Sequence, residues 1–318
     1  MVRELVVLGS ASQVPTRQRN HNGYLLRWDG EGFLFDPGEG TQRQFVVAGV
    51  AVSAVTCICI THFHGDHCLG LPGVLQRLSL DGVRRAVPVC FPASGEAFFE
   101  RLRHASAYDD RLDVRPVPVS PPDDGSLVVV PTGVELSVTL SAAPLSHSID
   151  SVGWRVEEPA GRTMLPDRLE AAGVRGPDIT KLQRDGFVAL GGSAGHPERR
   201  VVLDDVSVPR RGQRVAFVMD TAWCDGALAL ARGCDLLVCE ATFAEAEREL
   251  ALRWGHMTAR QAGELAAAAG ARALVLTHFS QRYPDTSALA REAAAVFDGD
   301  VVAATDLDRI PVPSRRTT

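Results

Sequence analysis

Thr61-His62-Phe63-His64-Gly65-Asp66-His67 is the stretch that decides the fold, and it directly follows the apolar run at residues 55–60. Its last six residues hold three imidazoles and one carboxylate. These are the ligand types of catalytic zinc sites, which keep an open position for water. The alternative is a polar loop after a buried strand, because short motifs also match by chance. Since the chain has only nine histidines, we interpret the stretch as the first half of a two-metal hydrolytic site.

Length and composition indicate one globular α/β domain, 1–318. The 45% of hydrophobic and 23% of charged residues are ordinary globular values in a chain of 318 residues. No apolar run approaches the roughly 18 residues of a membrane span. The N-terminus leads directly into the strand-like Leu5-Val6-Val7-Leu8, without the pattern of a signal peptide. We therefore expect a cytoplasmic protein with no membrane anchor.

Cysteine usage and charge restrict the function further. The seven scattered cysteines predict buried, reduced thiols rather than a disulfide framework. A net charge of −6 argues against a protein that coats nucleic acid non-specifically. If the substrate is a polyanion, the basic residues must be concentrated locally.

Hydrophobic periodicity predicts two β-rich halves that stack as sheets with helices outside. In the first half we expect strands at 5–8, 24–28, 33–35, 55–60 and 87–91, helices at 42–50, 69–80 and 96–105, a loop at 116–125, and a hairpin at 126–130 and 134–140. In the second half we expect strands at 151–156, 215–219, 236–239, 273–276 and 301–303, a helix after a capping box at Thr258, a helix ending at Phe297, and a polar tail.

Residues 160–213 interrupt this pattern with many Gly, Pro and charged positions, apart from a short helix expected at 167–172. We interpret them as an insertion. Residues 162–214 hold ten basic and seven acidic side chains, although the chain is acidic overall. This reversal suits an arm that contacts RNA, and a solvated loop is the alternative.

Further metal-ligand types stand where other apolar strands end. Asp220, Glu240 and His278 each follow such a run, as His62 does. Loops along one rim of a sheet are where α/β folds gather their sites. We assign His62, His64 and His147 to a first ion, Asp66, His67 and His278 to a second, and Asp220 as a bridge between the two.

A bridging carboxylate is the chemical reason for this assignment. Its two oxygens can hold divalent ions about 4 Å apart, which clamp the attacking and leaving oxygens of a phosphoryl transfer. His256 lies outside the ligand count and is a candidate proton donor to the leaving oxygen, with Glu240 holding its tautomer.

Each of these residues also has a structural alternative. His147 could lie on the surface, Asp220 could cap a helix, and His278 could be a satisfied core residue. His256 could merely precede a helix cap. His21, His104 and His196 have no partners in the pattern, and we assign them no role.

These residues carry a resemblance to a known family. Residues 61–67 resemble the HxHxDH signature of the metallo-β-lactamase superfamily, and residues 3–313 as a whole resemble its ribonuclease Z family of tRNA 3′-processing endonucleases. The more specific matches are the PxKxRN loop at 15–20, the second histidine region at 144–155, the HEAT and HxT segments at 240–243 and 255–258, and the last ligand motif at 276–283.

The resemblance implies an αββα sandwich with an inserted flexible arm, two zinc ions per subunit with Mn or Mg as substitutes, and a homodimer. It implies cleavage of precursor tRNA after the discriminator nucleotide, with Asp66 also acting as proton acceptor. Residues 168–186 resemble the arm that grips the tRNA elbow. The substrate-contacting residues that follow from the resemblance are Arg17, Arg19, Asn20, Gly176, Pro177 and Lys181.

Two departures from the family pattern bear on these expectations. Arg17 stands where the family has lysine, in the loop associated with sensing the CCA end, and a guanidinium fork differs from a point charge. Met257 replaces a commoner serine between His256 and Thr258. The rival hypotheses are a hydrolase of small phosphodiesters or esters and an inactive RNA-binding protein.

Overall fold

The computed structural model describes residues 2–191 and 199–315, so His196 lies outside the described residues. The chain forms two compact units. The first comprises the chain up to Glu157 together with Gln213–Ser314, and the second contains Glu158–Gly212.

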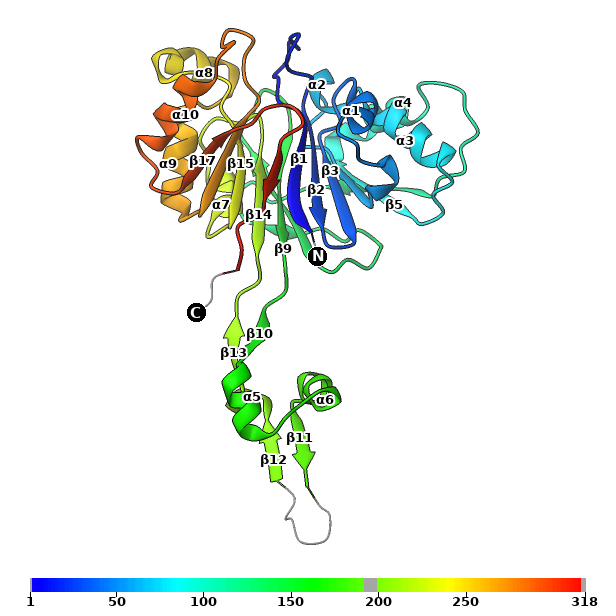
Figure 1. Ribbon diagram of the computed structural model, residues 1–318. Coiled ribbons are helices and arrows are strands. Elements are labelled where there is room, and N and C mark those ends of the chain that lie inside the picture. The colour runs from blue at the N-terminus through cyan, green and yellow to red at the C-terminus, as the bar shows by residue number, and fades with distance from the viewer. Residues whose placement is uncertain (1, 192–198, 316–318) are drawn as a thin grey trace. The chain divides into compact units, whose positions relative to one another are not determined.

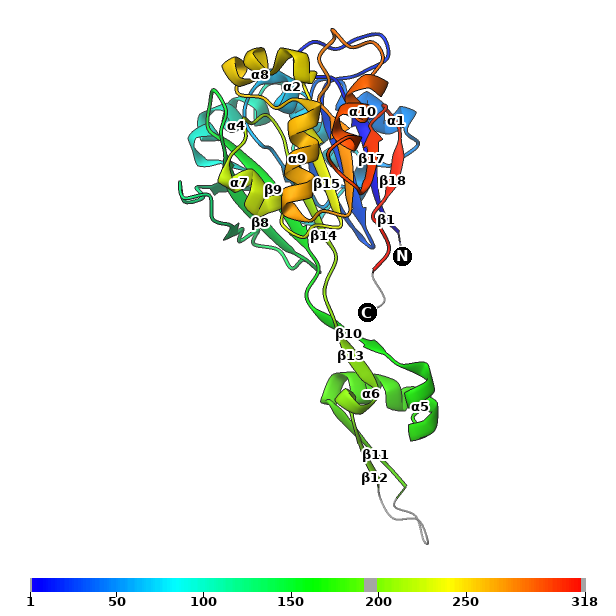
Figure 2. The ribbon, with the colours of Figure 1, turned by 90° about the vertical axis from the view of Figure 1, so that its left-hand side faces the viewer.

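Within the described residues, the first unit contains two seven-stranded sheets that pack against each other, with helices on their outer faces (Figures 1 and 2). The first sheet has the order β18 (Arg309–Pro311), β1 (Arg3–Gly9), β2 (Gly23–Trp28), β3 (Glu31–Phe35), β4 (Cys57–Cys59), β5 (Val87–Pro92), β6 (Val114–Val119). The second has the order β17 (Asp300–Ala303), β16 (Ala273–Thr277), β15 (Leu236–Glu240), β14 (Arg214–Val218), β9 (Ser151–Glu157), β8 (Thr139–Leu145), β7 (Val128–Val129).

Strand periodicity explains why both faces of each sheet are apolar. In β14, Val215 and Phe217 belong to the core between the sheets, whereas Ala216 and Val218 pack toward the helices. Alternate side chains of a strand point to opposite faces, so a sheet covered on both sides needs a continuous apolar run. Phe217 stacks on Phe35 of the opposite sheet, with ring centroids 3.7 Å apart. This contact joins the two sheets within the core of the first unit.

The helices of the first unit divide between the outer faces of the two sheets. Those of the N-terminal half are α1 (Thr41–Val47), α2 (Gly65–Cys68), α3 (Leu71–Leu80) and α4 (Glu96–Arg103). Those of the C-terminal half are α7 (Asp225–Ala231), α8 (Arg248–Trp254), α9 (Ala259–Ala269) and α10 (Ser287–Ala294). The predicted capping box is present at the start of α9, where Thr258 accepts from the Gln261 amide. The predicted αββα sandwich is therefore confirmed.

The second unit is built from two short hairpins and two helices. These are β10 (Gly161–Met164) with β13 (Ser207–Arg210), β11 (Phe187–Leu190) with β12 (Arg199–Val202), α5 (Pro166–Ala172) and α6 (Pro177–Asp185). Leu169, Leu182 and Val188 belong to its own small core. The sequence analysis expects only one short helix here. It misses α6, which begins with Pro177 at its first position, where a proline costs no hydrogen bond.

Three further expectations for the first unit are wrong. Residues 116–119 form part of β6 rather than a loop, because an outer strand tolerates prolines that cannot donate. The strand expected at 134–140 lies instead at Thr139–Leu145. The expected polar tail contains β18, which pairs with β1.

Two expectations on composition are tested as well. All seven cysteines are free, and six of them are buried, as predicted. Among the described residues, none of the helices is both long and apolar enough to span a bilayer.

Candidate metal centre

The predicted ligands meet because their strands end at a common edge. β14, β15 and β16 are parallel neighbours, so Asp220, Glu240 and His278 leave their carboxyl ends together. His62 follows β4 of the opposite sheet, and the Val152 amide donates to the Thr61 carbonyl at 2.9 Å, which links the two sheets beside the site.

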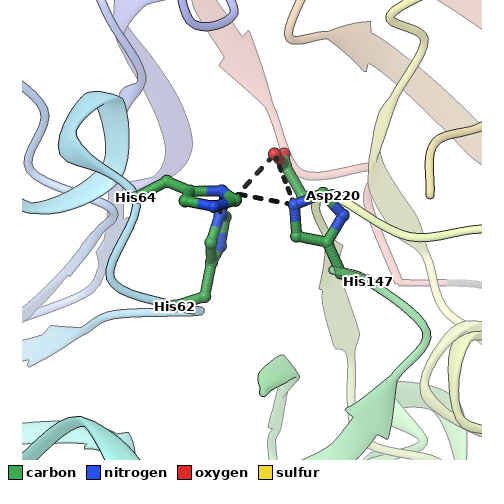
Figure 3. Close-up of side chains that lie close together, drawn as sticks. All are labelled: His62, His64, His147 and Asp220. Carbon is green, nitrogen blue, oxygen red and sulfur yellow. Dashed lines mark hydrogen bonds and ion pairs between the residues drawn. The ribbon is translucent and has the colours of Figure 1, made fainter. Parts of the chain in front are cut away.

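Four side chains form the first cluster, which Figure 3 shows with their polar atoms converging. His64 Nδ1 lies 3.0 Å from His62 Nε2 and 3.3 Å from His147 Nε2. Asp220 Oδ2 lies 3.6 Å from His62 Nε2 and 3.7 Å from His147 Nε2. This spacing leaves room for one ion among three nitrogens and one oxygen.

The second cluster shares Asp220 through its other oxygen. Asp220 Oδ1 lies 3.1 Å from His278 Nε2 and 3.4 Å from His67 Nε2. Asp66 Oδ2 lies 3.4 Å from His278 Nε2 and 3.3 Å from His67 Nε2. Asp220 therefore presents one oxygen to each cluster, as a bridging carboxylate does.

Outer hydrogen bonds fix which imidazole nitrogen faces each cluster. His147 Nδ1 donates to the Gly255 carbonyl at 2.9 Å, and His67 Nδ1 donates to Asp36 Oδ2 at 2.9 Å. Because a carbonyl and a carboxylate only accept, Nδ1 holds the proton of each ring, and in the neutral form of the ring Nε2 carries the lone pair. Such partners of metal-ligating histidines orient the ring and raise its basicity.

The clusters suit divalent cations because hydrogen-bond acceptor atoms face one another in them. His67 Nε2, which carries a lone pair when the ring is neutral, faces oxygens of Asp66 and Asp220. Asp220 Oδ1 is buried and receives no hydrogen bond. Buried acceptors without donors are costly, and a cation relieves the repulsion between them. The residues present therefore match a metal centre rather than a hydrogen-bonded polar cluster.

Protonation trends agree with this concentration of negative charge. Burial opposes the charged imidazolium, but the carboxylates of Asp220, Asp66 and Asp36 raise the pKa of His67 well above its ordinary value. Although burial favours the neutral acid, the neighbouring imidazoles of His67 and His278 hold the pKa of Asp66 far below its usual range. Protonation of His67 thus supplies positive charge next to these carboxylates, as a bound cation would.

Backbone strain is concentrated at the same residues. Among the described non-glycine residues only five have positive φ, and three of them, Asp36, Asp220 and His278, belong to the site with φ of 45°, 29° and 58°. Side chains with a Cβ adopt this region only when the surroundings fix them.

His256 and Glu240 form a pair next to the second cluster. Glu240 is fully buried and accepts from His256 Nδ1 at 3.0 Å, from the Thr221 amide at 2.6 Å and from the Thr242 hydroxyl at 2.6 Å. Burial lowers the pKa of His256, but Glu240 and Asp220 outweigh it and raise that pKa to about 9. The imidazole of His256 is therefore protonated near neutral pH.

A cavity of ≈ 380 Å³ opens onto these groups. Its lining combines five of the candidate ligands with residues of neighbouring loops and of α8: Ser12, Gln13, Val14, His64, Asp66, His147, Ser148, Asp220, Thr242, Phe243, Trp254, His256, His278, Ser280, Gln281 and Arg282.

The loop at 15–20 is placed next to this cavity, but its residues differ in exposure. Arg17 is exposed. Arg19 is buried, and its guanidinium donates to the Tyr283 carbonyl. The Asn20 amide donates to Asp306 Oδ2 at 2.7 Å, and its side chain donates to the Glu39 carbonyl at 2.8 Å. Gly176, Pro177 and Lys181 lie exposed at and within α6 of the second unit.

Sequence reasoning misses Asp36 and Asp306. The signal for Asp36 is its place directly after β3, where it could have been grouped with the other polar residues at strand ends. Asp306 has no such signal, because it acts through hydrogen bonds to Ser10 and Asn20, which lie nearly 300 residues away.

Comparisons with known proteins agree with this site. The family described as "Metallo-beta-lactamase superfamily" matches residues 16–196, and "Beta-lactamase superfamily domain" matches residues 197–279. Ribonuclease Z of Streptomyces coelicolor is 56% identical over 316 residues, 99% of each chain. Ribonuclease Z of Nocardia farcinica is 54% identical over 314 residues, again 99% of each chain.

One solved structure shares the fold. The short form of human tRNase Z superposes with a TM-score of 0.67 at 24% identity, covering 98% of this chain and 100% of that chain. The identity with the bacterial enzymes over nearly the whole length decides the family. The chain belongs to the ribonuclease Z family of the metallo-β-lactamase superfamily.

Proposed function

We propose that the chain cleaves tRNA precursors immediately after the discriminator nucleotide, using two zinc ions, to leave a tRNA 3′-hydroxyl and a 5′-phosphorylated trailer. As a member of its family, the chain is an endoribonuclease that removes 3′ trailers from tRNA precursors. The observation that supports the finer statement is the placement of Asp220, with one oxygen toward each of two ligand clusters.

The chain's own residues would hold the ions as two sets. His62, His64 and His147 would bind one, Asp66, His67 and His278 the other, and Asp220 both. When bound, such ions lower the pKa of a water molecule to near 7 and offset charge on the phosphoryl group. Nitrogen and carboxylate ligands suit zinc, and manganese is accepted by the same types.

We assign the proton transfers at the attacking water and at the leaving oxygen to two different side chains. Asp66 would accept the proton of the attacking water through the oxygen that does not face the second cluster. His256 would donate a proton to the leaving 3′-oxygen of the tRNA. Glu240 keeps His256 Nδ1 occupied, so the other ring nitrogen of His256 is the donor. Both Asp66 and His256 line the cavity, which supports these roles.

Substrate selection is assigned to residues outside the metal ligands. Arg17 is the member of the 15–20 loop whose exposed guanidinium is free to meet a phosphate, whereas Arg19 and Asn20 would position the loop. We assign the tRNA elbow to the second unit, through exposed Gly176, Pro177 and Lys181. We also propose a homodimer in which the arm of one subunit serves the other, which sedimentation velocity would test.

Cleavage of a defined precursor tests the function. Purified chain with zinc or manganese is expected to cut a tRNA precursor carrying a 3′ trailer at one position, read from the product ends. Asp66→Ala should abolish cleavage and leave RNA binding intact. Turnover of a small phosphodiester without any precursor cleavage would instead assign the chain to small diesters.

Metal content tests the bridging carboxylate independently of activity. Asp220→Asn should lower the bound zinc from two ions per chain to one or none, measured by atomic absorption after gel filtration. Asp225→Asn is the matched control, because Asp225 follows the same strand and lines a different cavity. A stoichiometry that Asp220→Asn leaves at two would refute the bridge.

A further inference from the structure

Trp254 is a large apolar side chain exposed at the entrance of the catalytic cavity. It is the last residue of α8, 60% exposed, and part of the cavity lining. Among the described residues its indole has no stacked or edge-on aromatic neighbour. Of the other apolar side chains in the lining, Phe243 is 7% exposed and the smaller Val14 is 40% exposed. An exposed indole leaves a large apolar area in contact with water. Contact with a ligand in the cavity would bury that area.

The backbone that carries Trp254 is fixed to the metal centre. Gly255 ends α8 with φ 68°, and its carbonyl accepts from His147 Nδ1 at 2.9 Å. A Cβ at Gly255 would lie 3.1 Å from His147 Nδ1, a tight contact at a positive φ that favours glycine. The His256 amide donates to the Ala251 carbonyl at 2.9 Å. The backbone that directly follows Trp254 is therefore fixed by hydrogen bonds to His147 and to α8.

The direction of cleavage decides which nucleotide faces this indole. The tRNA 3′-oxygen is the leaving group, so it lies next to His256 when it receives its proton. That oxygen belongs to the nucleotide on the 5′ side of the scissile phosphate. Trp254 precedes His256 by two residues and faces the same cavity.

We propose that the indole of Trp254 stacks on the base of the nucleotide immediately 5′ of the scissile phosphate and so sets the register of cleavage. This inference rests on the proposed function, because it uses His256 as the proton donor. Stacking on an aromatic ring needs only the face of a base, so any of the four bases can occupy this subsite. Stacking of one base contributes enough binding energy to change affinity by roughly tenfold.

Abasic substrates separate stacking from a structural role. The probes are one precursor with all bases, one abasic at the nucleotide 5′ of the cleavage site, and one abasic at the nucleotide 3′ of it. With the complete precursor, Trp254→Ala should raise KM about tenfold, and Trp254→Phe should restore most of the loss. With the 5′ abasic precursor, wild type and Trp254→Ala should have equal KM. With the 3′ abasic precursor, the tenfold difference should persist.

The matched control is Leu252→Ala, which removes a 71% exposed side chain of the same helix outside the cavity lining and should leave all three KM values unchanged. A Trp254→Ala defect that remains with the 5′ abasic precursor would overturn the proposal, as would one that disappears only with the 3′ abasic precursor. Failure of the wild type to cut the complete precursor would instead refute the proposed function.

Discussion

His67 Nδ1 donates a hydrogen bond to Asp36 Oδ2 across 2.9 Å, and neither side chain is exposed to solvent. Asp36 also accepts from the Thr61 amide at 2.7 Å and from the Thr61 hydroxyl at 2.8 Å. This one carboxylate therefore fixes both the start of the histidine turn and the ring that faces Asp66 and Asp220. It does so from a strained backbone with φ 45°.

Removing Asp36 should weaken metal binding without removing a ligand. In Asp36→Ala, His67 loses the acceptor that fixes its tautomer, so we expect the affinity for zinc to fall roughly 10- to 100-fold. Competition with a chromophoric chelator measures this affinity. Glu39→Ala is the matched control, since its side chain is 73% exposed and lies outside both clusters. If Asp36→Ala keeps wild-type affinity and fold, judged by circular dichroism, Asp36 has no such role.

His256 should matter only where the leaving oxygen needs a proton. In His256→Ala, we expect kcat for precursor tRNA to fall roughly 10²- to 10⁴-fold, because the ribose 3′-oxygen is a poor leaving group. Hydrolysis of bis(p-nitrophenyl) phosphate should fall much less, because nitrophenolate leaves without protonation. Equal losses on the two substrates would show that His256 supports the metal centre rather than the leaving group.

The clustering of the candidate ligands could be predicted from the sequence, because apolar runs show where strands end. Asp220 and His278 each follow an apolar strand, and parallel strands bring their carboxyl ends to one edge. The αββα layers follow from the same runs, since alternate residues such as Val215 and Ala216 serve two apolar faces.

The supporting residues could not be predicted in this way, because their partners are remote in sequence. The strand β18 and the role of Asp306 both depend on contacts with the first 20 residues of the chain. β6 carries two prolines that argue against a strand until its place at the sheet edge is known. In α6, Leu182 is the one buried side chain among many polar and charged residues, so the apolar periodicity that would predict a helix is weak.

Asp306 should act on the substrate loop and spare the metal centre. Its Oδ1 accepts from the Ser10 amide at 2.9 Å, and its Oδ2 accepts from the Asn20 amide at 2.7 Å. Asp306→Ala removes both anchors, so the 15–20 loop with Arg17 loses its fixed position. We expect a several-fold higher KM for precursor tRNA and an unchanged kcat for a small phosphodiester.

The control for Asp306 comes from the same turn. The side chain of Asp308 accepts from the Thr305 amide at 2.8 Å, so Asp308→Ala loosens this turn without removing a hydrogen bond to the substrate loop. It should leave the KM for precursor tRNA at the wild-type value. A rise in KM of the same size in both variants would mean that the turn, rather than the anchored loop, matters.

Deleting the second unit should separate tRNA recognition from the chemistry. The chain leaves and re-enters the first unit at paired positions, because Glu157 and Arg214 are antiparallel partners and Arg214 Nε donates to Glu157 Oε1 at 2.7 Å. Replacing residues 158–212 by Gly-Asn-Gly keeps Gln213 and closes a short hairpin loop between β9 and β14. The sheet and its ligand-bearing edge then stay intact, so hydrolysis of a small phosphodiester and zinc content should equal those of the full chain. Cleavage of precursor tRNA should fall by one to two orders of magnitude, mainly through KM, measured under single-turnover and steady-state conditions. A matching loss of small-diester hydrolysis, with zinc content retained, would show that the second unit supports the catalytic centre itself rather than the tRNA.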